Sequence, residues 1–238
     1  MTNAVSPWLI LLPLALGACE SRAIPAHVTP EAVRAEAARF DPGRYLTGGE
    51  LVFKDDFERA ELGPRWVVER SPKEADAADW RIEGGWLMTQ NTKNQGVWAE
   101  VIPDGPVRVE LVARSLTPPD KRQRFVGDLK LEAFATGPEH EKGYSLINGG
   151  WSNQFDTIAK LGEHSADERR VAARPLEADK VYRYAAVRTK DKILFFRDGE
   201  LLYTFDDARP IQGRWLGLNN WQSHAAFGEV AVYKLPAE

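Results

Sequence analysis

The sequence predicts an all-β protein, a two-sheet sandwich or jelly roll, and three observations lead to this prediction. Beyond residue 50, many runs alternate apolar and polar side chains with a period of two, which is the pattern of half-buried strands. These runs are short and are separated by turn-forming glycine, proline, asparagine and aspartate. No helical pattern follows residue 40, and the chain has no internal repeat. About a dozen antiparallel strands are therefore expected.

The turns between strands can be identified individually. Gly84 and Gly85 supply the tight turn of a hairpin within 79–90. Asp198 and Gly199 form the turn between two further expected strands, within 192–198 and 199–205. The other expected strands lie within 51–57, 66–70, 106–115, 127–135, 142–149, 155–161, 169–175, 181–189, 214–221 and 224–235.

The alternation in 106–115 also predicts which side chains enter the core. Because successive side chains of a strand point to opposite faces, Val109 and Leu111 are expected to point inward. Arg108 and Glu110 are then expected on the outer face.

The amino-terminal residues 1–18 are interpreted as a signal peptide. The apolar run 8–16 is too short to span a bilayer but suits the hydrophobic region of an export signal. It ends in L-G-A-C, which resembles the lipobox of bacterial lipoproteins, where the cysteine is acylated and the peptide is cut just before it. We therefore expect lipidation of Cys19, the chain's one cysteine, with an ordinary cleaved signal as the alternative. Lipidation implies a bacterial cell-envelope protein, anchored to a membrane on its periplasmic or outer face.

Residues 19–50 are predicted to be a tether with one short helix, and residues 51–238 a single sandwich domain. Thr29 is the expected N-cap of the helix and Pro30 its first residue. With one cysteine in 238 residues, no intramolecular disulfide can form, so burial must stabilise the domain. The net charge of −4 is spread along the chain, which excludes the basic footprint of a nucleic-acid partner.

Several motifs resemble the concanavalin A-like lectin/glucanase superfamily. LVFKDDFERAELGPRW (51–66) is similar to the opening strand of laminarinase-type glycoside hydrolases. The carboxyl-terminal half, YRYAAVRTKDKILFFRDGELLYTF followed by WLGLNNW and FGEVAVYKL, resembles 3-keto-disaccharide hydrolase-like domains and related bacterial sandwich domains. The resemblance covers residues 51–235 and implies a concanavalin A-like jelly roll that handles carbohydrate.

Laminarinase-type enzymes carry E-x-D-x-x-E on one strand, and this chain departs from that motif. In the register that 127–133 suggests, Asp128 takes the position of the nucleophile and Lys130 that of the middle acid. Ala133 then stands where the acid/base belongs, so retaining hydrolysis by this motif is not expected. The other match, Glu74-x-Asp76-x-x-Asp79, lies in a polar segment without a strand pattern.

Asp128, Lys130 and Glu132 nevertheless share one face of their predicted strand. One interpretation is an ordinary solvated face. The other is a groove in which Asp128 and Glu132 accept hydrogen bonds from sugar hydroxyls, with Glu132 able to act as a base in an elimination.

Two tryptophans lie among amides, in NGGWSNQF (148–155) and LNNWQSHAAF (218–227). A sugar offers an apolar face and a rim of hydroxyls, so an aromatic plate with amides around it suits a sugar site. The predicted ligand-binding residues are Asn148, Trp151, Asn153, Asn219, Asn220, Trp221 and Gln222. The remaining tryptophans of the domain, Trp66, Trp80, Trp86 and Trp98, have apolar or hairpin neighbours and are expected in the core.

Among the four histidines, His164 and His224 are candidate acid/base residues, whereas His27 and His140 are expected to be bystanders. No set of residues has the spacing of a metal site. No cofactor is expected, and a structural calcium ion at Asp55 or Asp56 remains an alternative.

Three functional hypotheses remain open at this point. The first is an exported, lipid-anchored protein that binds or captures a glycan in a groove on one sheet. The second is a glycoside hydrolase or lyase for an unusual or oxidised sugar, with Asp128, Glu132, His164 and His224 as candidate catalytic residues. The third is a structural envelope lipoprotein with no glycan ligand.

Overall fold

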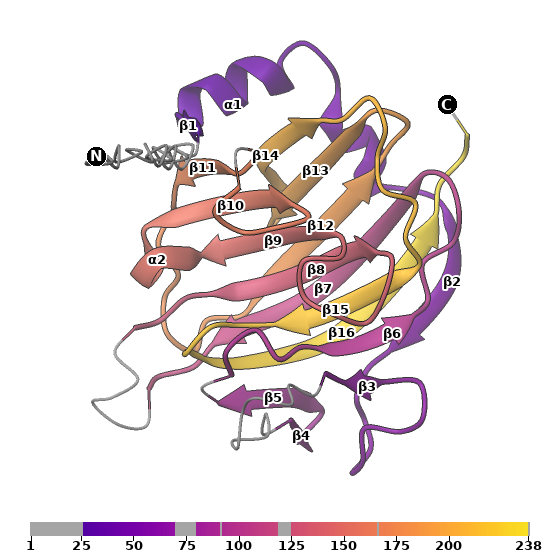
Figure 1. Ribbon diagram of the computed structural model, residues 1–238, viewed down its shortest axis with the longest axis vertical. Helices are drawn as coiled ribbons and strands as arrows, with labels where there is room; N and C mark the ends of the chain where they lie inside the picture. The colour runs from indigo at the N-terminus through magenta and orange to yellow at the C-terminus, as the bar shows by residue number, and fades with distance from the viewer. Residues whose placement is uncertain (1–25, 70–79, 91, 119–124, 166, 238) are drawn as a thin grey trace, which may run out of the picture.

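The structure is a computed structural model that describes residues 26–69, 80–90, 92–118, 125–165 and 167–237. Two large sheets pack face to face over this part of the chain (Figure 1). The predicted signal peptide, Cys19 and the segment from Glu74 to Asp79 lie outside the described residues. None of the described helices has the length and apolar character that a membrane crossing requires.

The first sheet has eight strands, and all neighbouring pairs except β1 and β11 are antiparallel. In spatial order it contains β1 (Ala26–Val28), β11 (Arg169–Ala172), β10 (Phe155–Lys160), β9 (Tyr144–Gly149), β8 (Leu129–Ala135), β15 (Trp215–Asn219), β6 (Val97–Glu100) and β3 (Val67–Val68).

The second sheet is antiparallel throughout its described pairs. In spatial order it contains β14 (Glu200–Asp206), β13 (Lys192–Arg197), β12 (Tyr182–Arg188), β7 (Val107–Ser115), β16 (His224–Lys234), β5 (Trp86–Gln90) and β4 (Arg81–Glu83), with β2 (Glu50–Asp55) also paired to β16. Two long antiparallel sheets confirm the predicted all-β sandwich.

The core lies between the two sheets and follows the predicted alternation. Val109 and Leu111 are buried there, as expected. Arg108 points to the outer face, also as expected, but it is buried as well because the chain folds over it. Its guanidinium donates to the carbonyl oxygens of Tyr45 (2.9 Å) and Gly48 (3.1 Å).

The segment predicted as a tether packs against the sandwich from residue 26 onward. The helix α1 (Pro30–Ala37) forms where expected, and the Thr29 side chain caps it by accepting from the N–H of Ala32. The 3-10 helix η1 (Pro42–Leu46) then covers part of the outer face of the second sheet, where Tyr45 joins a small apolar cluster. The strand β1 adds to the edge of the first sheet.

The tryptophans divide between the core and the outer faces. Trp66 is in the core as predicted. Trp80 is partly buried and packs against the core cluster. The core prediction is wrong for Trp86, which is half-buried on the outer face of the second sheet beneath the guanidinium of Arg114. It is also wrong for Trp98: its strand neighbours enter the core, so alternation puts this buried ring on the outer face of the first sheet. An apolar sequence context does not say which face a single ring takes.

Candidate functional site

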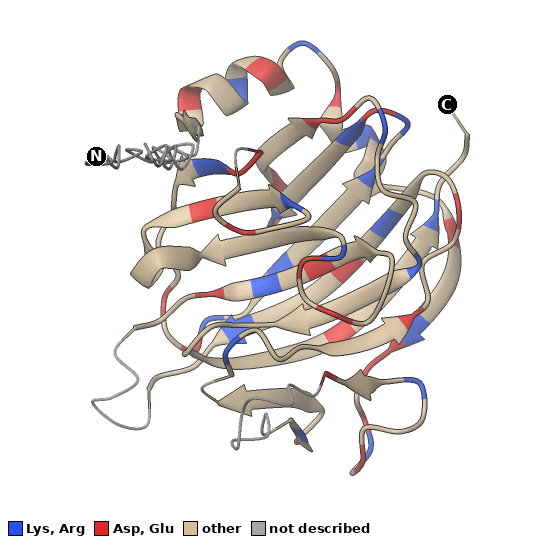
Figure 2. Ribbon diagram, in the orientation of Figure 1, with Lys and Arg blue, Asp and Glu red and all other residues tan. Residues whose placement is uncertain are grey.

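Charged residues alternate with uncharged ones along β8, in the middle of the first sheet (Figure 2). Leu129 and Leu131 fill the core, so Lys130 and Glu132 must point to the opposite face. Asp128 precedes the strand on the same side and lines a pocket there. This row is not solvated: Lys130 is 1 % exposed and Glu132 is 0 % exposed. Buried charges need partners, and each of these has them.

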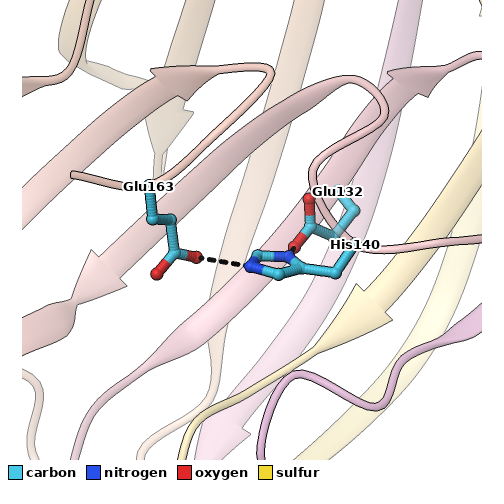
Figure 3. A group of neighbouring side chains, drawn as sticks. All are labelled: Glu132, His140 and Glu163. Atoms are coloured by element: carbon cyan, nitrogen blue, oxygen red, sulfur yellow. Dashed lines mark hydrogen bonds and ion pairs between the residues drawn. The ribbon is translucent and has the colours of Figure 1, made fainter. Parts of the chain in front are cut away.

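Glu132 forms a direct pair with His140, from the loop 136–143 that joins β8 to β9 (Figure 3). His140 Nδ1 donates to Glu132 Oε1 over 2.6 Å. Ser145 Oγ donates to the other carboxylate oxygen over 2.8 Å, and Asn219 Nδ2 lies 3.4 Å from Oε1. Glu132 is thus fully engaged by protein groups.

Glu69 fixes the same loop from the other side. It accepts from the backbone N–H of His140 (3.3 Å) and from Trp98 Nε1 (3.1 Å). Trp98 reaches this position because it lies directly over Gly217, where a Cβ atom would come within 2.6 Å of the indole. Gly217 on β15 thus leaves room for the Trp98 ring, which donates to the Glu69 carboxylate that in turn holds the loop 136–143.

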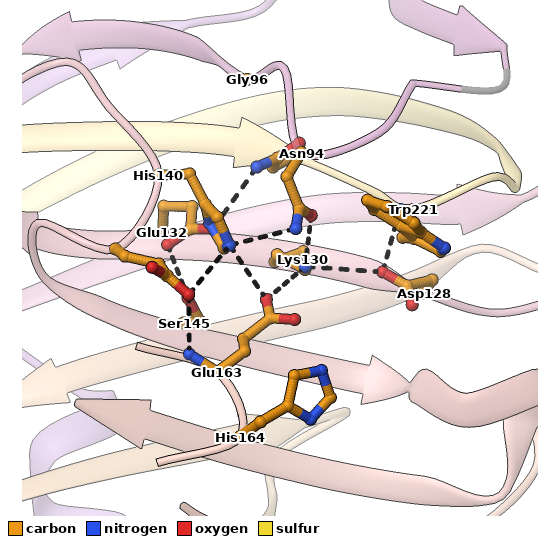
Figure 4. Close-up of polar contacts among 12 residues, drawn as sticks. Asn94, Gly96, Asp128, Lys130, Glu132, His140, Ser145, Glu163, His164 and Trp221 are labelled. Carbon is orange, nitrogen blue, oxygen red and sulfur yellow. Dashed lines mark hydrogen bonds and ion pairs between the residues drawn. The ribbon is translucent and has the colours of Figure 1, made fainter. Parts of the chain in front are cut away.

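Lys130 stands between two carboxylates of the outer face (Figure 4). Its ammonium donates to Glu163, which follows β10, and its Nζ atom lies 3.9 Å from Asp128 Oδ1. It also donates to Asn94 Oδ1 over 2.6 Å. The side chains of Asp128 and Glu163 are 10 % and 12 % exposed, so both remain accessible at the surface of the cluster.

These contacts shift the pKa values in opposite directions. Burial raises the pKa of Asp128 to about 6, against the attraction of Lys130. Burial opposes the charged form of Glu132 too, but the charges of His140 and Lys130 and the hydrogen bonds from His140 and Ser145 together outweigh it and lower the pKa of Glu132. Burial also opposes the charged forms of His140 and Lys130. The surrounding carboxylates, chiefly Glu132 at His140 and Glu163 at Lys130, together outweigh it and raise both pKa values. Asp128 therefore differs from Glu132, because its environment favours the protonated acid.

Next to Asp128 and Glu163 the surface opens into a pocket of about 370 Å³, the tryptophan pocket. Its described lining residues are Asn94, Phe125, Asp128, Ile147, Trp151, Ser152, Glu163, His164, Trp221 and Gln222. They come from the connection before β8, the strand β9, the turn α2 (Gly150–Asn153) and the segments after β5, β10 and β15. Residues far apart in the chain thus meet at one site.

The Trp151 side of the pocket is a tight, strained turn. Trp151, Ser152 and Asn153 all have φ between 50° and 65°, a left-handed conformation that costs about 1–2 kcal/mol per residue outside glycine. The Asn153 side chain holds this turn, since it donates to Leu176 O and accepts from Leu176 N–H. Strained backbone of this kind is common at ligand sites, which agrees with the position of the turn at the pocket.

Glycine also brings this turn to the start of β8. A Cβ atom on Gly127 would come within 2.2 Å of the Gly149 carbonyl oxygen. Because no side chain intervenes, the N–H of Asp128 donates to Gly149 O over 3.0 Å. The carboxyl group of Asp128 is in this way held beside the Trp151 turn.

The two rings differ in how much surface they offer. The guanidinium of Arg170 lies 3.9 Å from the centre of the Trp151 ring, and His164 meets the ring edge-to-face at 5.6 Å. The Trp151 ring is therefore half-buried and held in place by its contacts with Arg170 and His164. Trp221 is 41 % exposed, and its backbone N–H donates to Asp128 Oδ1 over 3.0 Å.

The structure brings Trp151, Trp221 and Gln222 together in the tryptophan pocket, but not the four predicted asparagines. Asn148 points between the sheets, where its amide oxygen accepts from Tyr184 and Arg197. The others, Asn153, Asn219 and Asn220, bond to Leu176, to Glu132, and to Thr92 and Ser223 respectively. The amides around the tryptophans mainly shape the loops that carry the rings.

The candidate catalytic residues divide as well. Asp128 and His164 line the tryptophan pocket, whereas Glu132 is fully buried and does not line it. His224 begins β16 on the outer face of the second sheet, since its neighbour Ala225 enters the core of the sandwich. It therefore does not meet the others.

Asp55, one of the two candidate calcium ligands, already has protein partners. Its carboxylate accepts from Arg59 through both oxygens, from Trp66 Nε1 and from the N–H of Phe57. Asp56 accepts from the N–H of Glu58. The acidic pair thus closes the loop after β2.

Sequence reasoning missed Asn94, His140 and Glu163, which belong to the charged cluster, as well as the pocket-lining residues Phe125, Ile147 and Ser152. His140 looked like part of a charged loop, and only its return over β8 brings it onto Glu132. The sequence feature that could have indicated these residues is the charge at 128, 130 and 132. If a loop buries a strand face with three charges, that loop must supply polar partners for them.

Glu132, His140 and Glu163 also present ligand atoms within 4.8 Å of one another, as a metal site would require. The fit to a cation is poor, because Glu132 is bonded to His140 Nδ1 and Glu163 to the ammonium of Lys130. Lys130 already supplies positive charge to these carboxylates.

Comparison with known proteins supports the fold. No protein-family profile matches the chain, and no curated protein is significantly similar in sequence. Similar solved structures include the endo-β-1,3-glucanase of Pyrococcus furiosus (13% identity, 80% of this chain and 96% of that one, TM-score 0.57). A laminarinase from Flavobacterium sp. UMI-01 (15%, 78% and 100%, 0.54) and a carbohydrate-binding module from Bacillus subtilis (15%, 71% and 96%, 0.52) are also similar. The chain therefore has the concanavalin A-like jelly-roll fold, as its motifs predicted.

Proposed function

We propose that this protein is carbohydrate-active and binds a glycan in the tryptophan pocket. The observation that carries the proposal is that Trp151 and Trp221, seventy positions apart in the sequence, line one pocket together with Asp128 and Glu163. Apolar plates beside a few fixed polar groups match the apolar face and the hydroxyl rim of a sugar ring.

The exposures of the rings agree with such a role. An exposed tryptophan such as Trp221 is hydrated in the free protein and gains contact area when a sugar covers it. Trp151, braced by Arg170, needs little ordering when a ligand arrives. Gln222 and Asn94 add amide groups at the rim.

The structural neighbours are consistent with this proposal. A glucanase, a laminarinase and a carbohydrate-binding module share the fold. Their identity to this chain is low, so they support the fold and leave the ligand to be found by experiment. An enzyme acting on an unusual or oxidised sugar, and a structural envelope protein without a ligand, are the alternatives.

Calorimetric titration of the purified domain against a glycan panel tests the proposal. Trp221→Ala and Trp151→Ala should each weaken binding by about 1–3 kcal/mol, the range for an aromatic at a binding hot spot. The matched control is Trp86→Ala, because Trp86 is also a half-buried ring under an arginine, but on the other sheet. Its affinity should equal that of the wild type.

Two results would contradict the proposal. If no glycan of the panel binds, the structural-protein hypothesis gains support. If Trp86→Ala weakens binding as much as Trp221→Ala, the ligand lies outside the tryptophan pocket.

We also propose that the mature protein begins at an acylated Cys19 and is held on a bacterial envelope membrane, on the periplasmic or outer face. The support is the lipobox-like L-G-A-C after a short apolar run. Cys19→Ser should then move the protein from the membrane fraction to the soluble fraction. Retention of this variant on washed membranes would contradict the anchor.

A further inference from the structure

We infer that Asp128 and Glu163 are a proton-donor and proton-acceptor pair that hydrolyses a glycosidic bond of the glycan in the tryptophan pocket. This inference rests on the proposed function, since it needs the glycan to bind there. Among the described residues that line the pocket, these two carry carboxyl groups.

Geometry selects this pair over the two acids that share the predicted strand. Glu132 is on the same face as Asp128, but it is 0 % exposed and bonded to His140, Ser145 and Asn219. It cannot reach a ligand without losing these bonds. Glu163 comes from the segment after β10 and presents its carboxylate to the pocket from the opposite side of Lys130 (Figure 4).

Lys130 gives the two carboxyl groups different tasks. Its ammonium donates a hydrogen bond directly to the Glu163 carboxylate, which fixes this group at the edge of the tryptophan pocket. It is 3.9 Å from Asp128 Oδ1, so its effect there is weaker. Burial dominates at Asp128 and raises its pKa to about 6, which keeps part of this acid protonated in mildly acidic solution. A carboxyl group that holds its proton and an ion-paired carboxylate at the same pocket suit opposite roles in proton transfer.

The bond changes balance without a further reactant besides water. Asp128 gives its proton to the bridging oxygen as the bond from that oxygen to the anomeric carbon breaks. The oxygen of a water molecule bonds to the anomeric carbon, and Glu163 takes a proton from this water. Loss of that proton from Glu163 and reprotonation of Asp128 restore the site, leaving one shortened glycan and one released sugar.

The hydrogen bond from the Trp221 N–H to Asp128 Oδ1 suits the donor role. It occupies one carboxyl oxygen over 3.0 Å, which leaves the other oxygen to carry the proton. Because the same residue supplies an exposed ring, a sugar that stacks on Trp221 lies next to the acid.

The experiment incubates the purified protein with each glycan that binds in the titration panel and analyses the products by mass spectrometry. The wild type should release shorter glycans, at a rate that falls as the pH rises above 6, as Asp128 loses its proton. Asp128→Asn and Glu163→Gln should each lower the rate by about 100-fold or more. Both variants should still bind the glycan within about threefold of the wild-type affinity, because the rings remain.

The control is Asp207→Asn, a carboxylate that pairs with Lys160 over 2.7 Å outside the tryptophan pocket. Its turnover should match that of the wild type. A second comparison, His164→Gln, tests whether the other titratable residue at the pocket is the base instead. It should retain most of the wild-type rate, and a loss as large as that of Glu163→Gln would overturn the assignment.

Binding and turnover separate this inference from the proposed function. A glycan that binds and is never cut would overturn the inference and leave the proposed function intact. Absence of binding to any glycan would overturn both. If Asp128→Asn melts early, the fall in wild-type rate above pH 6 and the Glu163→Gln rate still decide the question.

Discussion

The backbone N–H of Trp221 donates a hydrogen bond to Asp128 Oδ1 over 3.0 Å. This bond joins the exposed ring at the end of β15 to the acid at the start of β8, two segments 93 positions apart. The bond holds the carboxyl group of Asp128 next to the aromatic side of the tryptophan pocket.

Asp128→Asn should stabilise the protein in neutral and alkaline solution. The pKa of Asp128 is raised from 3.8 to about 6, so the folded state holds this proton more tightly than the unfolded state does. The stability that the proton contributes is complete below pH 3.8 and is lost as the pH rises through 6. At pH 8 the charge on Asp128 thus lowers the free energy of unfolding by about 3 kcal/mol. This is the net effect, since burial and Glu163 oppose the charge and Lys130 and His140 favour it.

The measurement is urea unfolding of both proteins at pH 4 and pH 8. The asparagine variant should be the more stable at pH 8 and should differ little from the wild type at pH 4. A variant that is less stable at both values would mean that the Asp128 carboxylate stabilises the fold when charged.

Lys130→Met should destabilise the protein strongly. The ammonium is 1 % exposed and faces Glu163 and Asp128, so its removal leaves buried negative charge without a partner. Breaking a buried pair in this way costs about 3–5 kcal/mol. The double variant with Glu163→Gln should recover part of this loss, because one of the charges is then gone.

The matched control for Lys130 is Lys54→Met at an exposed pair. Lys54 lies 2.6 Å from Glu229, and both side chains are nearly half exposed. Such pairs contribute about 0–1 kcal/mol. Equal losses for the two lysine variants, measured by thermal unfolding, would contradict the importance of the buried cluster.

Gly217→Ala should disturb the site through Trp98. The new Cβ atom would come within 2.6 Å of the indole, which must shift away from Glu69 and loosen the loop 136–143. Overpacking of this kind costs about 1–3 kcal/mol. Gly137→Ala, in the same loop but with nothing within 4 Å of its Cβ position, should be neutral by comparison in a melting curve.

Leu111→Ala tests the inward face that the sequence predicted. Leu111 is 4 % exposed in the core, so its truncation should cost about 2–5 kcal/mol in urea unfolding. Leu51→Ala, at a residue that is 50 % exposed, should cost much less. A Leu111→Ala loss below about half a kcal/mol would contradict the burial of this face.

The sequence by itself determined the fold class and the strand faces. Alternation is a local property, because neighbouring side chains of a strand must point to opposite sides. It therefore placed Leu111 in the core and put Asp128, Lys130 and Glu132 on one face without knowledge of the sheet order. The capping by Thr29 is local for the same reason, since it depends on residues within one helical turn.

Only the tertiary structure decided which residues form the candidate site. His140 and Glu163 are separated from Lys130 by loops whose paths no local pattern fixes, and the closure of these loops over β8 makes them partners. The faces of Trp86 and Trp98 were decided in the same way, by the register of their strands in the sheets. Strand faces are a local property, because the backbone of a strand points successive side chains to opposite sides. A site on a jelly roll is not local, because it needs distant segments to pack together, and this packing depends on the order of all the strands in the sheet.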